Sequence, residues 1–139
     1  MKKKNVVINK DIFCIQKMDC VFCHLKQKNN KNNLNKFLYT DRHFYIIKDI
    51  NPKYTKHFLV ISKFHFPHLN LNQWKYFKKL EKSHKKESRL KLNLFFSNFI
   101  KQLPKILKTL KLNTGFKIII NSIYDQEINH LHLHLVYNK

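Results

Sequence analysis

No stretch of this 139-residue chain approaches the roughly 18–20 consecutive apolar residues that a membrane-spanning helix requires. The basic beginning "MKKKNVVINK" is no signal peptide, because Lys10 and Asp11 interrupt the apolar run too early. The three cysteines are an odd number and do not indicate the disulfide framework of a small secreted protein. These absences predict a protein of the reducing cytoplasm.

Acidic residues are also scarce, with 8 Asp and Glu against 28 Lys and Arg and a formal net charge of +20. Such an excess points toward polyanionic partners: nucleotides, nucleic acid or an anionic membrane surface. Composition offers another explanation, because Lys, Asn, Ile and Phe have codons rich in A and T and the lysines are spread along the chain. Both explanations stay open. Nucleic acid is a possible but not a favoured partner, and no membrane is expected.

Apolar residues make up 43% of the chain, which is enough to bury the core of one domain. Alternating and β-branched runs predict strands, separated by turns such as "NPKYTK" (51–56). No internal repeat or domain boundary is evident. The sequence therefore predicts an α+β domain with a mainly antiparallel sheet. The expected strands are 37–40 and 43–50, which form a hairpin, then 57–63, 116–121 and the segment from residue 130.

Residues 71–112 are predicted to be helical, because apolar residues such as Trp74 and Phe77 recur at spacings of three and four. Pro104 interrupts the second half, where it is expected to start a separate helix or to kink this one. The single glycine, Gly115, ends the region. A short element is also expected at "DCVFCHLKQ" (19–27).

Three histidines, His130, His132 and His134, alternate with leucines near the end of the chain. This period of two is typical of a strand with leucines facing the core and imidazoles sharing the other face. Three rings in strict alternation argue against ordinary buried histidines. They could form a three-histidine zinc site with an open position for water. They could also divide the roles, one ring acting as nucleophile while others bind and protonate.

The pair Cys20-x-x-Cys23 has the spacing with which two thiolates can bind one Zn²⁺ in a tetrahedral site. A redox dithiol is less favoured because the usual βαβ context is missing, and two packed thiols are the structural alternative. Two histidines, His57 and His65, flank the predicted strand 57–63 and cannot easily serve one site. Asp49 precedes a turn, where a carboxylate can accept hydrogen bonds from ribose hydroxyls or simply form the turn.

Taken together, "CVFC", "DINP…HFLVISKFH", "GFKIIIN" and "DQEINHLHLHL" resemble the histidine triad (HIT) superfamily, in order and spacing its Hint branch of nucleoside phosphoramidate hydrolases. The resemblance covers roughly residues 19 to 137. It implies a HIT-like fold: a mainly antiparallel five-stranded sheet, a central helix region at 71–112 and a short N-terminal helix. Residues 1–18 would form an N-terminal arm and residues 19–139 the HIT domain. A homodimer is also expected by resemblance, paired through the central helix and its strand.

The resemblance also implies roles for the matched positions. His132 would be the nucleophile that forms a nucleotidyl-histidine intermediate, with His134, His57 and Gln126 beside the phosphate and leaving group. The residues expected to hold a purine nucleotide are Asp49 at the ribose, Ile50, Phe22 and Leu25 around the base, and Asn121 near the sugar-phosphate. A structural zinc would be held by Cys20, Cys23, His65 and His130.

Several positions depart from the Hint pattern. Ser62 stands where proline is usual, and the loop between Asn121 and Gln126 is about two residues shorter and lacks glycine. The printed chain carries no Gly-Gly-Arg tail after the triad. We therefore expect the catalytic machinery to be kept and the specificity elements to be reduced. The alternative functions are a dinucleoside polyphosphate hydrolase and a catalytically weakened nucleotide- or nucleic-acid-binding module.

Overall fold

The computed structural model describes residues 20–27, 36–66, 82–121 and 130–139. The described part is an α+β fold, as the sequence predicts. A short helix α2 (Val21–Gln27) precedes strands β1 (Tyr39–Thr40), β2 (Phe44–Lys48) and β3 (Lys56–Ser62). The long helix α4 (Lys82–Thr109) follows, and β4 (Lys117–Ile119) and β5 (His132–Tyr137) complete the fold.

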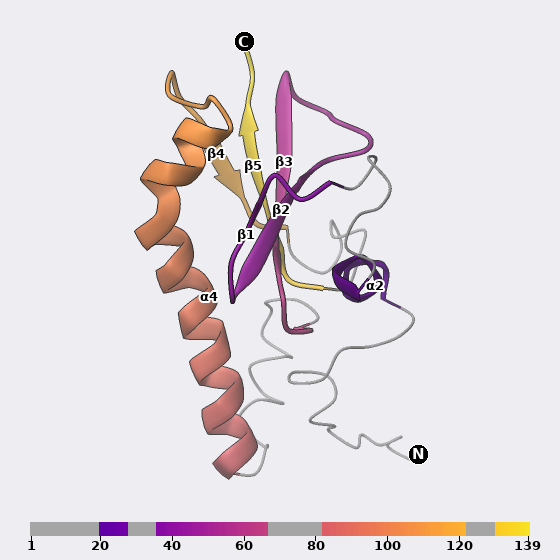
Figure 1. Ribbon diagram of the computed structural model, residues 1–139, viewed down its shortest axis with the longest axis vertical. Coiled ribbons are helices and arrows are strands. Elements are labelled where there is room, and N and C mark those ends of the chain that lie inside the picture. Colours follow the sequence, from indigo (N-terminus) through magenta and orange to yellow (C-terminus); the bar gives the residue numbers. More distant parts are fainter. Residues whose placement is uncertain (1–19, 28–35, 67–81, 122–129) are drawn as a thin grey trace.

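The strands form one five-stranded antiparallel sheet in the order β1-β2-β3-β5-β4. Its centre is the pair β3 and β5, in which Leu59 lies opposite His134 and Ile61 opposite His132. The predicted hairpin at 37–50 is confirmed as β1 and β2. The helix α4 covers one face of the sheet and α2 lies at the other, so the two faces have different environments (Figure 1).

The face toward α4 carries the main hydrophobic core. Leu133 and Leu135 of β5 are almost fully buried, together with Phe95 and Phe99 of α4. Phe44, Val60 and Phe66 belong to the same cluster. The predicted orientation of the triad segment is therefore confirmed: its leucines face the core, and His132 and His134 lie on the opposite face.

The face toward α2 carries a smaller core of Phe22, Tyr45, Ile47, Leu59 and Ile61. The buried Tyr45 hydroxyl donates a hydrogen bond to the carbonyl oxygen of Phe22, at 2.6 Å, which fixes α2 against the sheet. Burial raises the pKa of Tyr45 well above its usual range, so the phenol keeps this proton. Phe22 is thereby held beside the triad segment.

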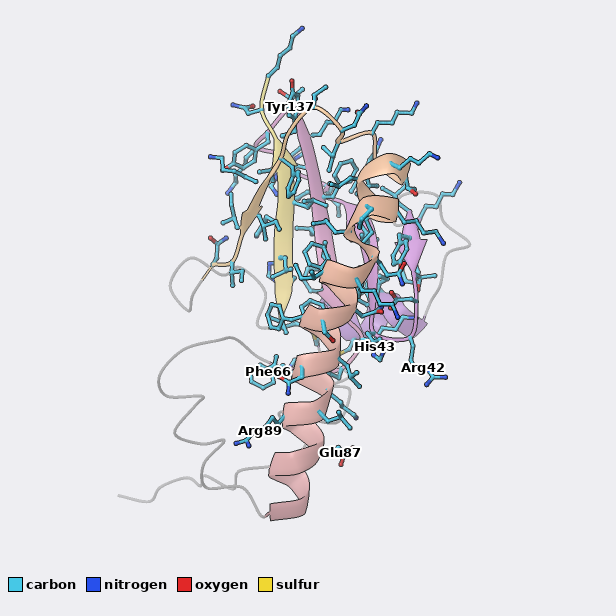
Figure 2. The ribbon with its side chains drawn as sticks, turned by 90° about the vertical axis from the view of Figure 1, so that its left-hand side faces the viewer. Arg42, His43, Phe66, Glu87, Arg89 and Tyr137 are labelled. Atoms are coloured by element: carbon cyan, nitrogen blue, oxygen red, sulfur yellow. The ribbon has the colours of Figure 1, made fainter. Side chains whose placement is uncertain are left out.

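The helix α4 is continuous from Lys82 to Thr109 with Pro104 inside it, so the expectation of a separate helix starting at Pro104 is wrong. Proline removes only one N–H and displaces one helical hydrogen bond. Because Pro104 is exposed, the carbonyl that loses its partner can be hydrated, while Phe99 and Ile106 still anchor the helix on the sheet. Figure 2 shows α4 crossing the sheet, with Phe66 beside it and Glu87 and Arg89 on turns that extend beyond the strands.

The chain leaves α4 through two residues of positive φ, Lys111 (58°) and Gly115 (140°). The positive φ of Gly115 is one that other residues rarely adopt, which explains the place of the single glycine in the chain. Residues 1–18 and the part of the predicted helix region from 71 to 81 lie outside the described residues. Within the described ranges, no helix is long and apolar enough to cross a bilayer.

Candidate active site and metal cluster

The triad segment supplies two separate clusters. His130, just before β5, is almost fully buried and lies with the residues of α2 and the end of β3. His132 and His134, on β5 itself, lie on the α2 face with His57 of β3. The three triad rings therefore do not converge on one ligand, and the three-histidine zinc site is not supported by the geometry.

The first cluster consists of the four residues predicted to bind metal: Cys20, Cys23, His65 and His130. Their ligand atoms all lie within 4.8 Å of one another. The Nδ1 atom of His130 is 3.2 Å from Nδ1 of His65, 3.3 Å from the Cys20 sulfur and 3.5 Å from the Cys23 sulfur. The Cys23 sulfur is also 3.5 Å from Nδ1 of His65.

These distances fit a tetrahedral metal ion. Ligand atoms about 2.0–2.3 Å from a common centre at tetrahedral angles are roughly 3.3–3.8 Å apart. The Cys20 thiol is set up as a ligand, because its pKa is lowered to about 2, chiefly by its hydrogen bond with Cys23, against the opposing effect of burial. The four residues could thus hold a metal ion, and two thiolates with two imidazoles are a set that suits zinc.

The far side of His130 supports the same interpretation. Its Nε2 lies 2.7 Å from the carbonyl oxygen of Ser62, to which an Nε2–H donates. A neutral imidazole with its proton on Nε2 has its lone pair on Nδ1, the atom that faces Cys20, Cys23 and His65. A backbone carbonyl that fixes the tautomer in this way is a common support of metal-binding histidines.

The second cluster lines a cavity of about 490 Å³ between α2, the β2–β3 connection and β5. Apolar side chains that include Phe22, Leu25 and Ile50 line part of the cavity. The imidazoles and the side chains of Asp49 and Asn121 also line it. The structure therefore brings together eight predicted site residues in one cavity: Phe22, Leu25, Asp49, Ile50, His57, Asn121, His132 and His134.

His132 is held in one orientation. Its Nδ1 lies 2.7 Å from the carbonyl oxygen of His130, and the edge of Phe22 packs at 5.1 Å between ring centroids. Because a carbonyl only accepts, Nδ1 must carry a proton, and the lone pair of the neutral ring is then on Nε2. A lone pair held in this way is what a nucleophilic imidazole requires.

His57 and His134 form a hydrogen-bonded chain beside His132. The backbone N–H of Lys53 donates to Nδ1 of His57 at 3.1 Å, so the proton of the neutral ring is on Nε2. That Nε2 lies 2.8 Å from Nδ1 of His134 and 3.2 Å from the Asp49 carboxylate. Asn121 lies at the far end, with its amide nitrogen 3.2 Å from Nε2 of His134.

Both rings of this chain are neutral near pH 7. Burial, with His132 and His57 as weaker contributors, lowers the pKa of His134 to about 4. Burial also lowers the pKa of His57, which Asp49 opposes and Lys53 reinforces. Asp49, His57 and His134 are close enough to hold a metal by distance alone. The Lys53 bond places a proton on the His57 nitrogen that a metal would need, so a hydrogen-bond chain fits better.

Two predicted site residues remain to be placed, and two residues that line the cavity were not predicted. Gln126 lies outside the described residues. Ile50 lines the cavity but is 72% exposed, so it stands at the mouth. Lys53 and Tyr54 also line the cavity and were missed, because nothing in "NPKYTK" distinguishes them from ordinary turn residues.

The five-stranded α+β fold, the Cys/His cluster and the histidine-lined cavity are those expected of a histidine triad protein. Comparison with known proteins supports this class. Residues 30–139 match the HIT domain, and the chain belongs to this family. It is 29% identical over 120 residues to Protein HitA of Neisseria gonorrhoeae, covering 85% of this chain and 94% of that protein.

Two solved structures are similar as well. A histidine triad protein from Clostridium difficile and a HIT family hydrolase from Clostridium thermocellum each align with a TM-score of 0.63 and 25% identity. Each alignment covers 88% of this chain and 93% of the other.

Proposed function

We propose that this protein is a nucleotidyl hydrolase or transferase of the Hint type. It would cleave purine nucleoside phosphoramidates or related nucleotide conjugates through a nucleotidyl-histidine intermediate on His132. The observation that carries the proposal is the orientation of His132, whose Nδ1 is bound to the His130 carbonyl at 2.7 Å while the residue lines the cavity. The name of the Clostridium thermocellum relative, a HIT family hydrolase, agrees with this assignment.

The reaction would proceed in two substitutions at phosphorus. In the first, Nε2 of His132 forms an N–P bond while the bond from phosphorus to the leaving group breaks; the electron pair departs with that group, which takes up a proton from solvent when it is an amine. In the second, the oxygen of water forms an O–P bond and gives up a proton to solvent, the N–P bond breaks, and its electron pair returns to Nε2 of His132. The product is a nucleoside monophosphate. His134 would donate a hydrogen bond from Nε2–H to a phosphoryl oxygen, and His57 would lie beside the phosphate and donate to Nδ1 of His134.

The cavity supports a matching orientation of the nucleotide. The apolar side chains of Phe22, Leu25 and Ile50 would hold the purine. Asp49 would accept hydrogen bonds from the ribose hydroxyls. Asn121, beside His134, would contact the sugar-phosphate. Gln126 would stand beside the leaving group.

We also propose that Cys20, Cys23, His65 and His130 bind a structural zinc ion. Bound zinc would join α2 to the end of β3 and the start of β5, and so would fix the carbonyl of His130 that orients His132. Elemental analysis of the purified protein tests this. We expect one zinc per chain, lost in Cys20→Ser and kept in His134→Ala. The opposite pattern would support a three-histidine site instead.

The domain organisation and the localisation are also proposals. Residues 19–139 would form the HIT domain behind an N-terminal arm at 1–18, and the protein would be cytoplasmic.

We also propose that the chain forms a homodimer through α4 and β4. Exposed apolar side chains support this, because β4 is an edge strand and Ile100 of α4 and Ile118 of β4 are 62% and 39% exposed.

Hydrolysis of an adenosine phosphoramidate tests the enzyme assignment. We expect AMP release by the wild-type protein, loss of at least about a thousandfold in His132→Ala, and little change in His43→Ala, a histidine at the β1–β2 turn. Faster turnover of a diadenosine polyphosphate would favour that substrate class. Salt-dependent nucleic-acid binding without turnover, unchanged in His132→Ala, would favour a binding module.

A further inference from the structure

The described residues that line the cavity include two lysines, Lys48 and Lys53, and the carboxylate of Asp49. Lys48 lies opposite Phe58 in the β2–β3 pair, and Phe58 belongs to the core on the α4 face. Residues opposite each other in a sheet share a face, so the Lys48 side chain starts on the α4 side, away from His132.

Lys53 is placed differently. It follows the β2 strand in the connection to β3, and its backbone N–H is bonded to Nδ1 of His57 at 3.1 Å. Lys53 therefore lines the cavity from a position beside the histidine chain. Its charge agrees with this position, since it contributes to the lowered pKa of both His57 and His134.

The neighbouring side chain holds this connection in place. Tyr54 is half-buried and packs edge-on against His57, with ring centroids 5.3 Å apart and an interplanar angle of 79°. At the far side of the connection, Thr55 is bonded to Asn138 through both its backbone N–H and its hydroxyl, each at 3.3 Å. Lys53 is thus carried by a segment that is tied to the histidines and to the end of β5.

We propose that Lys53 is a specificity-determining residue that binds negative charge on the leaving group, so that the site favours nucleotides whose phosphorus is linked to a further phosphate. This rests on the proposed function and deepens it. In the first substitution, N–P forms, the bond from phosphorus to the bridging oxygen breaks, and its electron pair leaves as phosphate charge. An ammonium beside that oxygen stabilises the charge as it develops.

Binding of two unreactive ligands tests the proposal independently of turnover. The probes are AMP and its α,β-methylene diphosphate analogue, measured by calorimetry with the full chain. We expect the wild-type protein to bind the diphosphate more tightly, and Lys53→Gln to reduce this preference about tenfold, the size of one charge-assisted contact. Lys53→Arg should keep the preference. Lys105→Gln, on the exposed side of α4, should leave it unchanged.

An equal loss of AMP and diphosphate binding in Lys53→Gln, or no loss of either, would overturn the proposal. So would a wild-type protein that binds both probes equally. Failure of the proposed function would give a different result. The wild-type protein would turn over neither a phosphoramidate nor a polyphosphate conjugate. Its tighter binding of the diphosphate, and the dependence of that binding on Lys53, would still be measurable. The substitution keeps the backbone N–H that bonds His57, so the histidine chain stays intact.

Discussion

Ser62 shows at the scale of one residue how the Cys/His cluster is supported. It is fully buried, and its carbonyl accepts from Nε2 of His130 at 2.7 Å. Its hydroxyl lies 2.8 Å from the carbonyl oxygen of Phe64 and 3.2 Å from that of Leu131. Its backbone N–H donates to Leu131 as well, a bond that the proline usual in Hint proteins could not make. Serine therefore adds contacts around His130 of the proposed zinc site.

Replacement of this hydroxyl tests its contribution. We expect Ser62→Ala to lower the free energy of unfolding by about 1–2 kcal/mol and to weaken zinc binding by about tenfold, because the Phe64 carbonyl loses a buried partner. Competition with a zinc chelator and urea unfolding measure the two effects. Ser97→Ala, at an exposed position of α4, is the matched control. Unchanged zinc affinity in Ser62→Ala would contradict this role.

The titration of His134 gives a second residue-scale prediction. Its pKa of about 4 lies below the ordinary value of 6.5, because burial disfavours the charged ring. The unfolded chain therefore takes up this proton first as pH falls, so this ring's contribution to stability is fully present above pH 6.5 and is lost as pH falls toward 4. NMR titration of the zinc-loaded protein should show a midpoint near 4, assigned by the signal missing in His134→Asn. A midpoint at or above 6.5 would contradict the burial argument.

For single residues, the sequence identifies site residues when their type and spacing are unusual. Histidines in strict alternation and a Cys-x-x-Cys pair have few structural explanations, and the structure brings most of them into two clusters. Lys53 is different, since it is one of 28 basic residues in the chain. Only the folded β2–β3 connection distinguishes it from the rest.

Among the elements, β3 and β5 determine the geometry of the site. Their antiparallel register places His57 near the start of β3 on the same face as His134, which lies opposite Leu59. Period-two alternation predicts such faces from the sequence alone, because successive side chains point to opposite sides of a strand. The same alternation does not predict which strands are neighbours in the sheet. The separation of His130 from the other two triad rings needed the resemblance or the structure.

The helix α4 carries a prediction at this scale, because its continuity across Pro104 costs one hydrogen bond. Pro104→Ala restores an N–H for the carbonyl of Ile100, so we expect the free energy of unfolding to rise by about 1–3 kcal/mol. The greater conformational entropy of the unfolded chain with alanine offsets part of this gain. Urea unfolding measures it. The exposed neighbour Lys105→Ala should change stability by less than about 0.5 kcal/mol. A less stable Pro104→Ala protein would contradict the expected gain.

For the whole molecule, the two faces of the sheet separate stability from chemistry. The α4 face holds the larger core, and the α2 face holds the metal cluster and the cavity. A hydrophobic pattern predicts both layers, but it does not say which apolar residues stay exposed. Ile100, Phe116, Ile118 and Ile120 remain exposed along α4 and the β4 edge, where a second copy would cover them.

Substitution at that edge tests the proposed dimer. We expect Ile118→Lys to convert the dimer to a monomer, because a buried ammonium without a partner opposes association. Light scattering after size exclusion measures the mass. Ile50→Lys is the matched control, since it changes an exposed isoleucine that follows β2 and belongs to neither α4 nor β4. A wild-type monomer, or a dimer that persists in Ile118→Lys, would contradict the proposed interface.

The most direct test of the whole account is the mass of the denatured protein after brief reaction with an adenosine phosphoramidate, followed by peptide mapping. The account predicts one AMP per chain, attached to His132, on a protein that holds zinc at Cys20, Cys23, His65 and His130. An adduct on a different residue, or no adduct at any time while AMP is released, would contradict the mechanism.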